Sequence, residues 1–403
     1  MQAKTKTKRK PWVLPRHKII VMLVFWIIYP WARLKYGIRM ERFREKKDRQ
    51  YLILFNHQTA FDQFFVSISF RKPVYYIASE DLFSLGFLSK LLRWAVAPIP
   101  IKKQTTDVQA VMNCLRVAKE GGTIALAPEG NRTFHGLPVH MNPAITPLIK
   151  KLNLPLVIYR IEGGFGIQPR WSDVCRKGRM RSYVSRVIEP EEYQSLSKEE
   201  LFDLIYRELY VDDTQFAGPF RHKKLAEYLE RAMYVCPHCG LSEFHSEGSI
   251  IHCKQCGRKI RYLEDQRLEG VGFDFPFPYV AQWYQYQCDY VNQLDVRQYL
   301  LNPIFRDRVQ LSLVEPYKCK HLLEKDASVS LYGNRIQVGQ LTLHFEDINV
   351  ITVLGKNKLN IYHKDGIYQF KADARFNALK YVNIFYRSRQ LQDDGKENFF
   401  LGI

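Results

Sequence analysis

The stretch that decides the fold is Tyr51-Leu52-Ile53-Leu54-Phe55-Asn56-His57-Gln58-Thr59-Ala60-Phe61-Asp62. Its apolar residues predict a short buried strand, and the polar residues after them predict a loop at the carboxyl end of that strand, where open α/β sheets bind their ligands. On a continuous helix, residues five apart point about 140° away from each other. His57 and Asp62 can therefore meet only if a turn intervenes and Asp62 lies in the first turn of the next helix. Asp62 would then accept from one imidazole nitrogen and leave the other as a general base.

A second polar loop follows another apolar stretch, residues 123–127. It reads Pro128-Glu129-Gly130-Asn131-Arg132-Thr133 and carries a carboxylate, a guanidinium and a hydroxyl. We expect both loops at the same edge of one sheet. Strands are predicted at 51–55, 73–78, 96–101, 123–127, 155–161 and 181–188, with a helix at 107–120. This alternation predicts a three-layer α/β domain over residues 46–215.

Four blocks of this region resemble the glycerolipid acyltransferases, the family of the bacterial lysophosphatidic acid acyltransferase. Asn56-His57 to Asp62 is similar to the N-H-x-x-x-x-D block, and residues 128–133 resemble P-E-G-T-R-S. Residues 97–103 resemble the intermediate block and residues 154–158 the last, proline-led strand. All four occur in the family's order over roughly residues 40–200. The resemblance implies transfer of a fatty acyl group from an acyl thioester, carried by coenzyme A or acyl carrier protein.

The chemistry assigns roles to these residues. A lysolipid hydroxyl is a poor nucleophile at neutral pH, so we expect His57 to act as general base and Asp62 to orient its ring, with the substrate hydroxyl in place of the serine of a catalytic triad. A guanidinium binds phosphate through two parallel hydrogen bonds. The predicted acceptor-binding residues are Glu129, Gly130, Asn131, Arg132, Lys102 and Lys103. An ion pair between Arg132 and Glu129 is the structural alternative.

Two positions depart from the family pattern. Asn131 stands where the family usually has Thr, and Lys102-Lys103 stand where an Arg commonly contributes to acceptor binding. Lysine supplies charge without the bidentate fork of arginine. These departures leave the pair of His57 and Asp62 intact but bear on the identity of the acceptor.

The N-terminal segment, residues 1–45, is basic and apolar. Residues 1–50 hold fifteen Lys or Arg against three acids, which is +12 of the net +19 of the chain. Such a segment is attracted to an anionic lipid surface by about 1 kcal/mol per cation. The apolar run Ile19 to Tyr29 is shorter than the ~18 to 20 residues that span a bilayer. We therefore expect residues 12–40 to lie in the interface as a membrane-associating helix, with a buried helix as the alternative.

Residues 216–265 carry a metal-binding pattern. Two C-x-x-C pairs are separated by thirteen residues, and their cysteines are Cys236, Cys239, Cys253 and Cys256. Four thiolates at this spacing predict a closed structural zinc ribbon, with iron in a rubredoxin-like site as the competitor. Two disulfides are disfavoured because no secretory signal is evident. The other cysteines, at 114, 175, 288 and 319, are interpreted as free thiols.

The remaining chain is predicted as a connector at 266–300 and a β-rich module at 301–403. Short strands are expected at 328–338, 341–345, 348–354, 358–362 and 366–370, followed by a helix at 376–387. Several strands closed by one helix resemble a pleckstrin-homology or GRAM-like module.

The sequence thus predicts an O-acyltransferase on the cytoplasmic face of the cell membrane, peripheral or monotopic, that converts 1-acylglycerol-3-phosphate to phosphatidic acid. Its expected partners are an anionic membrane surface, a lysophospholipid and an acyl carrier. Acylation of another lysolipid or of glycerol phosphate is one alternative. A membrane-docked zinc-ribbon adaptor without catalysis is another. Nucleic-acid binding through the ribbon and the basic tail leaves the acyltransferase blocks unexplained, so no nucleic acid is expected.

Overall fold

The computed structural model describes residues 11–46, 49–79, 82–83, 86–101, 107–315 and 320–392 of the 403-residue chain. Its first part, residues 11–215, is built on a seven-stranded sheet of order β1-β7-β6-β2-β5-β3-β4. Every neighbouring pair is parallel except β6 and β7. The strands are β1 (Ile38–Met40), β2 (Leu52–Phe55), β3 (Val74–Ser79), β4 (Ile99–Ile101), β5 (Thr123–Leu126), β6 (Leu156–Glu162) and β7 (Met180–Ile188). We call this the α/β part.

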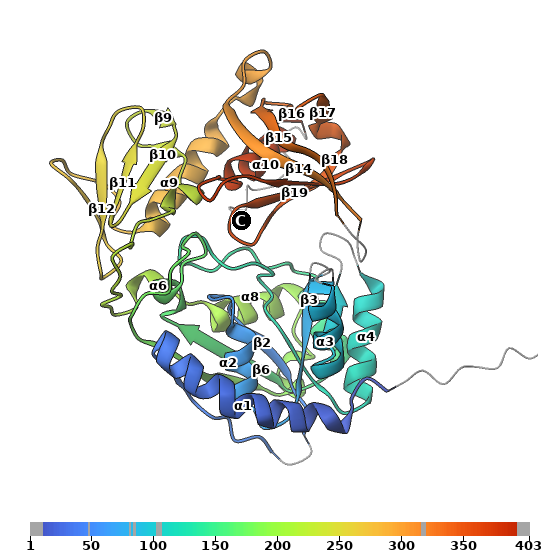
Figure 1. The fold of residues 1–403 in the computed structure, drawn as a ribbon. Coiled ribbons are helices and arrows are strands. Elements are labelled where there is room, and N and C mark those ends of the chain that lie inside the picture. The colour runs from blue at the N-terminus through green and yellow to red at the C-terminus, as the bar shows by residue number, and fades with distance from the viewer. Residues whose placement is uncertain are drawn as a thin grey trace, which may run out of the picture.

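Helices cover both faces of this sheet (Figure 1). Along β2, Leu52 and Leu54 pack on the side of α4, α5 and α8, whereas Ile53 and Phe55 pack on the side of α1 and α2. Because strand side chains alternate between faces, an all-apolar strand of this kind is buried on both sides. The helices are α1 (Pro15–Tyr36), α2 (Asp62–Ser69), α3 (Phe87–Ala95), α4 (Val108–Lys119), α5 (Ile145–Leu152), α6 (Gly164–Ile167), α7 (Pro190–Tyr193) and α8 (Lys198–Leu209).

The predicted mixed α/β domain is confirmed. The six predicted strands correspond to β2 to β7, and the helix predicted at 107–120 corresponds to α4. Asp107 caps α4, since its carboxylate accepts from the amide of Ala110 at 3.0 Å. The short strand β1 was not predicted.

Helix α1 is longer than the apolar run that it contains. It spans 22 residues and continues through Pro30 to Tyr36, after which Gly37 closes it in the left-handed conformation (φ 58°). Its most apolar 18 residues have a mean hydropathy of 1.5, and only 11% of them are buried. By length and composition α1 could cross a membrane. Its exposed apolar side chains are Ile19, Met22, Leu23, Trp26, Ile27 and Leu34.

The middle part, residues 216–300, contains the cysteine pairs. It consists of the two-stranded sheet β8 (Val235–Cys236) and β9 (Gly240–Leu241), and of the antiparallel sheet β10 (Phe244–Glu247), β11 (Ile250–Cys253), β12 (Lys259–Tyr262) and β13 (Leu268–Gly270). Helix α9 (Val280–Gln293) packs against it through Trp283, whose ring nitrogen donates to the carbonyl of Val235 at 2.9 Å. The 3-10 turn η2 (Asp213–Gln215) precedes this part, η3 (Leu229–Arg231) lies within it, and η4 (Val296–Tyr299) lies at its end.

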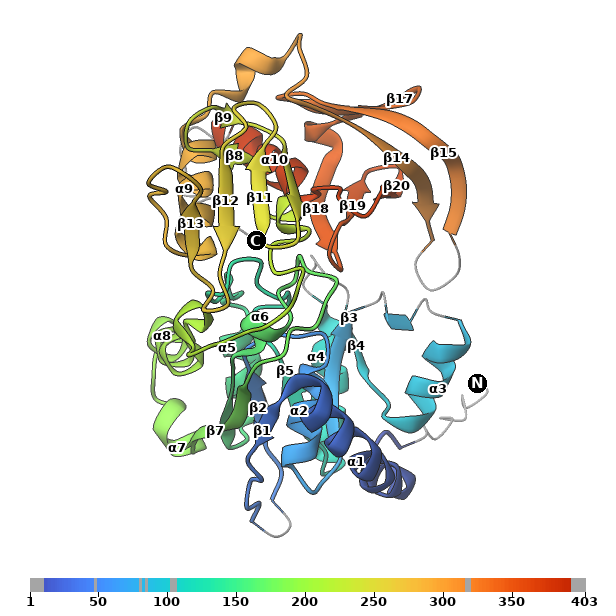
Figure 2. The same ribbon diagram turned by 60° about the vertical axis from the view of Figure 1, so that its left-hand side comes forward.

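The C-terminal part, residues 301–392, is a seven-stranded antiparallel sheet of order β17-β16-β15-β14-β20-β19-β18. It contains β14 (Phe305–Val314), β15 (Lys320–Leu331), β16 (Arg335–Val338), β17 (Leu341–His344), the turn η5 (Phe345–Asp347), β18 (Ile348–Leu354), β19 (Lys358–His363) and β20 (Gly366–Lys371), followed by α10 (Leu379–Gln392). Figure 2 shows this sheet above the α/β part, with the hairpin β18–β19 directed toward it. The predicted β-rich region is confirmed, and its likeness to a pleckstrin-homology or GRAM module stays a prediction.

Candidate active site

The loop between β2 and α2 holds His57 against Asp62. The Nδ1 atom of His57 lies 2.8 Å from Oδ2 of Asp62, and Asp62 begins α2. This is the turn that the five-residue spacing requires. The Asp62 carboxylate also accepts from the amides of Gln58 (2.6 Å) and Thr59 (2.9 Å) and from the Thr59 hydroxyl (2.6 Å). The loop therefore wraps around one fully buried carboxylate and fixes its orientation.

Asn56 anchors the start of this loop. Its side-chain amide donates to the carbonyl of Ile161 at 2.7 Å, and its side-chain oxygen accepts from the amide of Ile161 at 2.8 Å. These two bonds continue the pairing of β2 with β6 by one residue. The next residue, His57, is consequently placed at the carboxyl edge of the sheet. Its side chain is 25% exposed, so Nε2 is available to a substrate when Nδ1 donates to Asp62.

Glu129 connects the two polar loops, which lie on the neighbouring parallel strands β2 and β5. Its carboxyl oxygens accept from the amides of His57 (3.3 Å) and Val139 (3.4 Å). Burial raises the pKa of Glu129 to about 8, so the carboxyl is largely neutral at pH 7. Among the described residues no ion pair joins Glu129 to Arg132, so the structural alternative of a Glu129–Arg132 ion pair is not seen. Glu129 holds the backbone that carries His57.

Arg132 is a partly buried cation of the site. Burial lowers its pKa, and the negative charge of Asp62 opposes this effect. Its Nη1 atom is buried and has no hydrogen-bond partner within the described residues. The hydroxyl of Tyr36, at the end of α1, is also buried and has no hydrogen-bond partner in the part of the chain that the structure describes. A buried guanidinium nitrogen left unpaired costs free energy that a bound anion would recover.

The other predicted acceptor residues have different surroundings. Gly130 adopts a left-handed conformation (φ 63°) with open space where a Cβ would lie. Asn131 donates its amide to the carbonyl of Glu129 at 2.7 Å. The Thr133 hydroxyl accepts from the amides of His135 and Gly136, so it shapes the turn. Lys102 and Lys103 lie outside the described residues.

The four predicted metal ligands converge. The sulfur atoms of Cys236, Cys239, Cys253 and Cys256 all lie within 4.8 Å of one another. The Sγ atoms of Cys236 and Cys256 are 3.8 Å apart, close to the ~3.8 Å edge of a tetrahedron with Zn–S bonds of about 2.3 Å. The four cysteines therefore fit the tetrahedral coordination of one metal ion by four thiolates. Such a closed site stabilises the fold and leaves no position for a substrate.

The family model named Acyltransferase matches residues 38–158. We call residues 38–158 the acyltransferase domain, after the family model that they match. Among solved structures, the chain is similar to a 1-acyl-sn-glycerophosphate (LPA) acyltransferase, PlsC, from Thermotoga maritima. The two share 18% sequence identity, and the match covers 48% of this chain and 80% of that chain with a TM-score of 0.40. No curated protein sequence matches the chain. The acyltransferase domain contains His57, Asp62, Glu129 and Arg132 but not the residues that contact it from the rest of the chain.

Two of those residues, Tyr36 and Arg170, were not predicted from the sequence. Tyr36 lies on α1, and Arg170 follows the matched segment by twelve positions; the Nη1 atom of Arg170 donates to the carbonyl of Arg132 at 2.9 Å. Neither residue stands in a recognisable motif. A buried arginine beside a polar loop is evident only once the fold brings the two together.

Proposed function

We propose that this chain transfers a fatty acyl group from an acyl thioester to the free hydroxyl of a lysophospholipid, and that the acceptor is 1-acylglycerol-3-phosphate. The observation that supports the reaction is the bond between His57 Nδ1 and Asp62 at the base of an acyltransferase-domain loop. With the Nδ1 proton held by the carboxylate, Nε2 takes the proton of the attacking hydroxyl. A positioned imidazole of this kind contributes roughly 10² to 10⁴-fold to the rate.

The reaction divides into two proton transfers. His57 accepts the hydroxyl proton as the acceptor oxygen attacks the thioester carbonyl, and the resulting imidazolium is stabilised by Asp62. Collapse of the tetrahedral intermediate breaks the carbon–sulfur bond, and the proton passes from His57 to the leaving thiolate. The products are the acylated lipid and the free thiol of the carrier.

The choice of a phosphate-bearing acceptor rests on Arg132. Its buried Nη1 atom has no partner among the described residues, and it lies within electrostatic reach of Asp62. A guanidinium at this place suits the phosphate of 1-acylglycerol-3-phosphate, which bears its charge a few bonds from the reacting hydroxyl.

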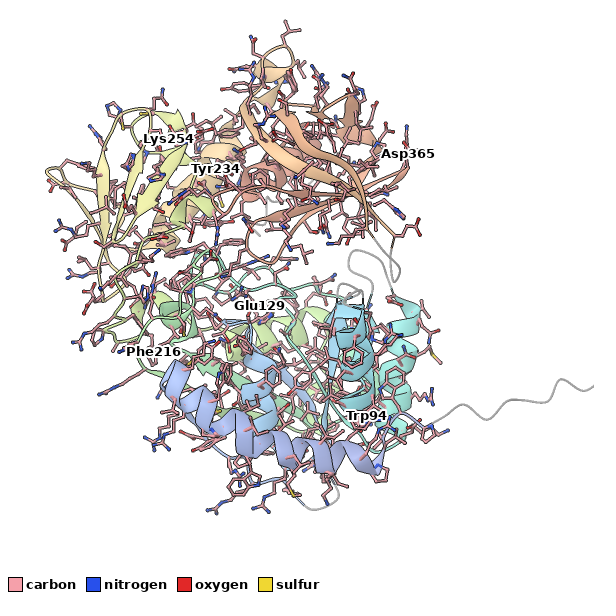
Figure 3. All side chains as sticks on the ribbon, in the orientation of Figure 1. Trp94, Glu129, Phe216, Tyr234, Lys254 and Asp365 are labelled. Atoms are coloured by element: carbon pink, nitrogen blue, oxygen red, sulfur yellow. The ribbon has the colours of Figure 1, made fainter. Side chains whose placement is uncertain are left out.

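We further propose that the enzyme works on the cytoplasmic face of a membrane, which it binds through α1 and α3. Arg16 of α1 donates to the carbonyl of Trp94 on α3 at 3.1 Å, so the two helices are adjacent. On α3, Phe87, Leu91 and Trp94 are exposed at helical spacing, and they continue the exposed apolar surface of α1. Figure 3 shows Trp94 beside α1, at the base of the α/β part and away from Glu129. Exposed aromatic and aliphatic side chains with flanking cations are typical of an interfacial helix surface.

An acceptor panel tests the proposal. Purified protein is incubated with acyl-coenzyme A and, in separate reactions, with lysophosphatidic acid, lysophosphatidylcholine and monoacylglycerol, and both thiol release and the lipid product are measured. We expect phosphatidic acid from the first acceptor and at least tenfold lower kcat/KM with the acceptor that lacks phosphate. Equal use of all three acceptors would contradict the assignment of Arg132 to a phosphate monoester.

A further inference from the structure

The hairpin β18–β19 of the C-terminal part touches the loop that carries Arg132. Arg170 makes the connection, because its guanidinium donates to the carbonyl of Arg132 (2.9 Å) and to the carbonyls of Val353 and Gly355 (both 2.8 Å). Val353 is the last residue but one of β18, and Gly355 lies in the turn that follows the strand. Both ribbon views show this hairpin pointing toward the α/β part (Figures 1 and 2).

Arg170 is a rigid connector. It is 3% exposed and makes no ion pair with a carboxylate in the described part of the chain. Its charge is balanced by three carbonyl dipoles and by the face of the Phe134 ring, whose centroid lies 4.3 Å from the guanidinium carbon. A planar group with donors in a fixed fork holds its acceptors at fixed positions. The turn of the hairpin is therefore held in register with the Arg132 loop.

Lys356 stands at the tip of this turn. Its Nζ atom lies 2.8 Å from Asp173 Oδ1, and its side chain is 29% exposed. Asp173 is already held by Arg231, whose two terminal nitrogens lie 2.7 and 2.9 Å from its carboxylate oxygens. Asp173 thus keeps a bidentate partner without Lys356. The ammonium of Lys356 is a surplus cation that can move to another anion at small cost.

The charges around Arg132 favour a doubly charged anion. Burial lowers the pKa of Lys356, Asp173 raises it, and the charges of Arg231 and Arg132 lower it further, so these groups sense one another. Burial and the charge of Arg132 also lower the pKa of Arg170 to about 9, which leaves it positive at neutral pH. Because Glu129 is neutral, the two carboxylates here are Asp62 and Asp173. The cations are Arg132, Arg170, Arg231 and Lys356, which leaves an excess of two positive charges. A phosphate monoester carries about −1.5 to −2 at pH 7.

We infer that the C-terminal part completes the acceptor site, with Lys356 of the β18–β19 turn and Arg132 of the acyltransferase domain binding one phosphate monoester between them. On binding, Lys356 leaves Asp173 to Arg231 and donates to the phosphate, while Arg132 gains the partner that its Nη1 atom lacks. Arg170 is a positioning residue that holds the turn carrying Lys356 against the loop carrying Arg132. This inference rests on the proposed function and adds to it a specificity residue from outside the family domain.

The test compares Lys356→Gln with Lys364→Gln. Lys364, in the turn after β19, is a matched control. Its Nζ atom also pairs with an aspartate and lies 2.8 Å from Oδ1 of Asp347. Binding of lysophosphatidic acid in detergent micelles is measured by calorimetry for the full-length wild type and both variants, and KM is measured for the acceptor and for the acyl donor. Thermal melting of each variant checks that it is folded.

We expect Lys356→Gln to raise the Kd and KM for lysophosphatidic acid about tenfold, as loss of a charge-assisted hydrogen bond does, and Lys364→Gln to leave both unchanged. Acyl-coenzyme A also carries a phosphate monoester, so the KM for acyl-coenzyme A shows whether Lys356 binds the phosphate of the acceptor or that of the acyl donor. A change confined to the donor, or a Lys356→Gln variant that binds lysophosphatidic acid as the wild type does, would overturn the inference. A wild type that binds lysophosphatidic acid through Lys356 but forms no product with any acceptor would refute the proposed reaction and leave the phosphate site standing.

Discussion

Replacing Asp62 by asparagine removes one charge from the candidate site and changes little of its shape. The carboxylate accepts from the His57 ring, from two amides and from one hydroxyl. An asparagine can place its oxygen toward His57 or toward Thr59. In either orientation the negative charge that stabilises the imidazolium is lost, and in the second orientation the amide donors of the asparagine face the His57 nitrogen and force the unproductive tautomer.

The magnitude follows from these two effects. Loss of the charge alone, at a nitrogen–oxygen distance of 2.8 Å inside the protein, is expected to lower kcat by about 10²-fold, and loss of the correct tautomer brings the total to about 10⁴-fold. This range corresponds to about 2.7 to 5.4 kcal/mol of activation free energy. We expect a smaller effect on KM, because Asp62 is completely buried and does not contact the acceptor in this account.

The assay is steady-state thiol release for the wild type, Asp62→Asn and Asp213→Asn. Asp213 is a matched control because its buried carboxyl accepts from the amides of Gly163 and Phe165, both at 2.6 Å, and touches no histidine among the described residues. Burial raises the pKa of Asp213 to about 7, so half of its charge is already absent at neutral pH. We expect Asp213→Asn to keep kcat within about threefold of the wild type. A folded Asp62→Asn protein with a similarly small loss would refute the assigned role of Asp62.

Three further predictions follow from other parts of the structure. Because burial raises the pKa of Glu129 from 4.5 to about 8, the folded protein keeps a proton that the unfolded chain releases, and stability falls as the pH rises through that window. We expect Glu129→Gln to flatten this fall by about 1 to 4 kcal/mol between pH 5 and 8 in urea denaturation, and an unchanged slope would contradict the assignment. Elemental analysis should find one zinc per chain, and the zinc should be lost in Cys236→Ser and retained in Cys288→Ser. Iron in place of zinc would contradict the assignment of the cysteine cluster to zinc. Trp26→Glu on α1 should weaken binding to anionic vesicles about tenfold or more in flotation assays, whereas Leu301→Glu, at another exposed apolar position, should not.

The sequence was sufficient for the parts of the site that are local in the chain. The strand at 51–55 appears as Leu52–Phe55, and the five-residue spacing of His57 and Asp62 produces the turn that it requires. Apolar runs with polar loops after them are readable because burial on both faces leaves no room for polar residues in such a strand. The α/β part was predicted for the same reason, whereas the N-terminal helix followed from its apolar run and the β-rich end of the chain from short strands with turn residues between them.

The contacts that complete the site could not be read from the sequence. Arg170 and Gly355 are separated by 185 positions, and no periodicity or motif connects them. The strand β14 was also not predicted. Its exposed residues Arg306 and Arg308 are charged, and charged residues at this spacing are equally typical of a solvated loop. Such features depend on which surfaces meet after folding. Sequence patterns report local burial, whereas the pairing of remote segments requires the tertiary structure.

If His57 is the base for acyl transfer, its removal must abolish product formation without affecting acceptor binding. Wild type and His57→Ala are compared, at equal folded concentration, for conversion of lysophosphatidic acid and acyl-coenzyme A to phosphatidic acid. We expect product from the wild type and a rate at least about 10³-fold lower from His57→Ala, with unchanged binding of lysophosphatidic acid. Equal rates from both proteins, or no product from the wild type with any acyl carrier, would contradict it.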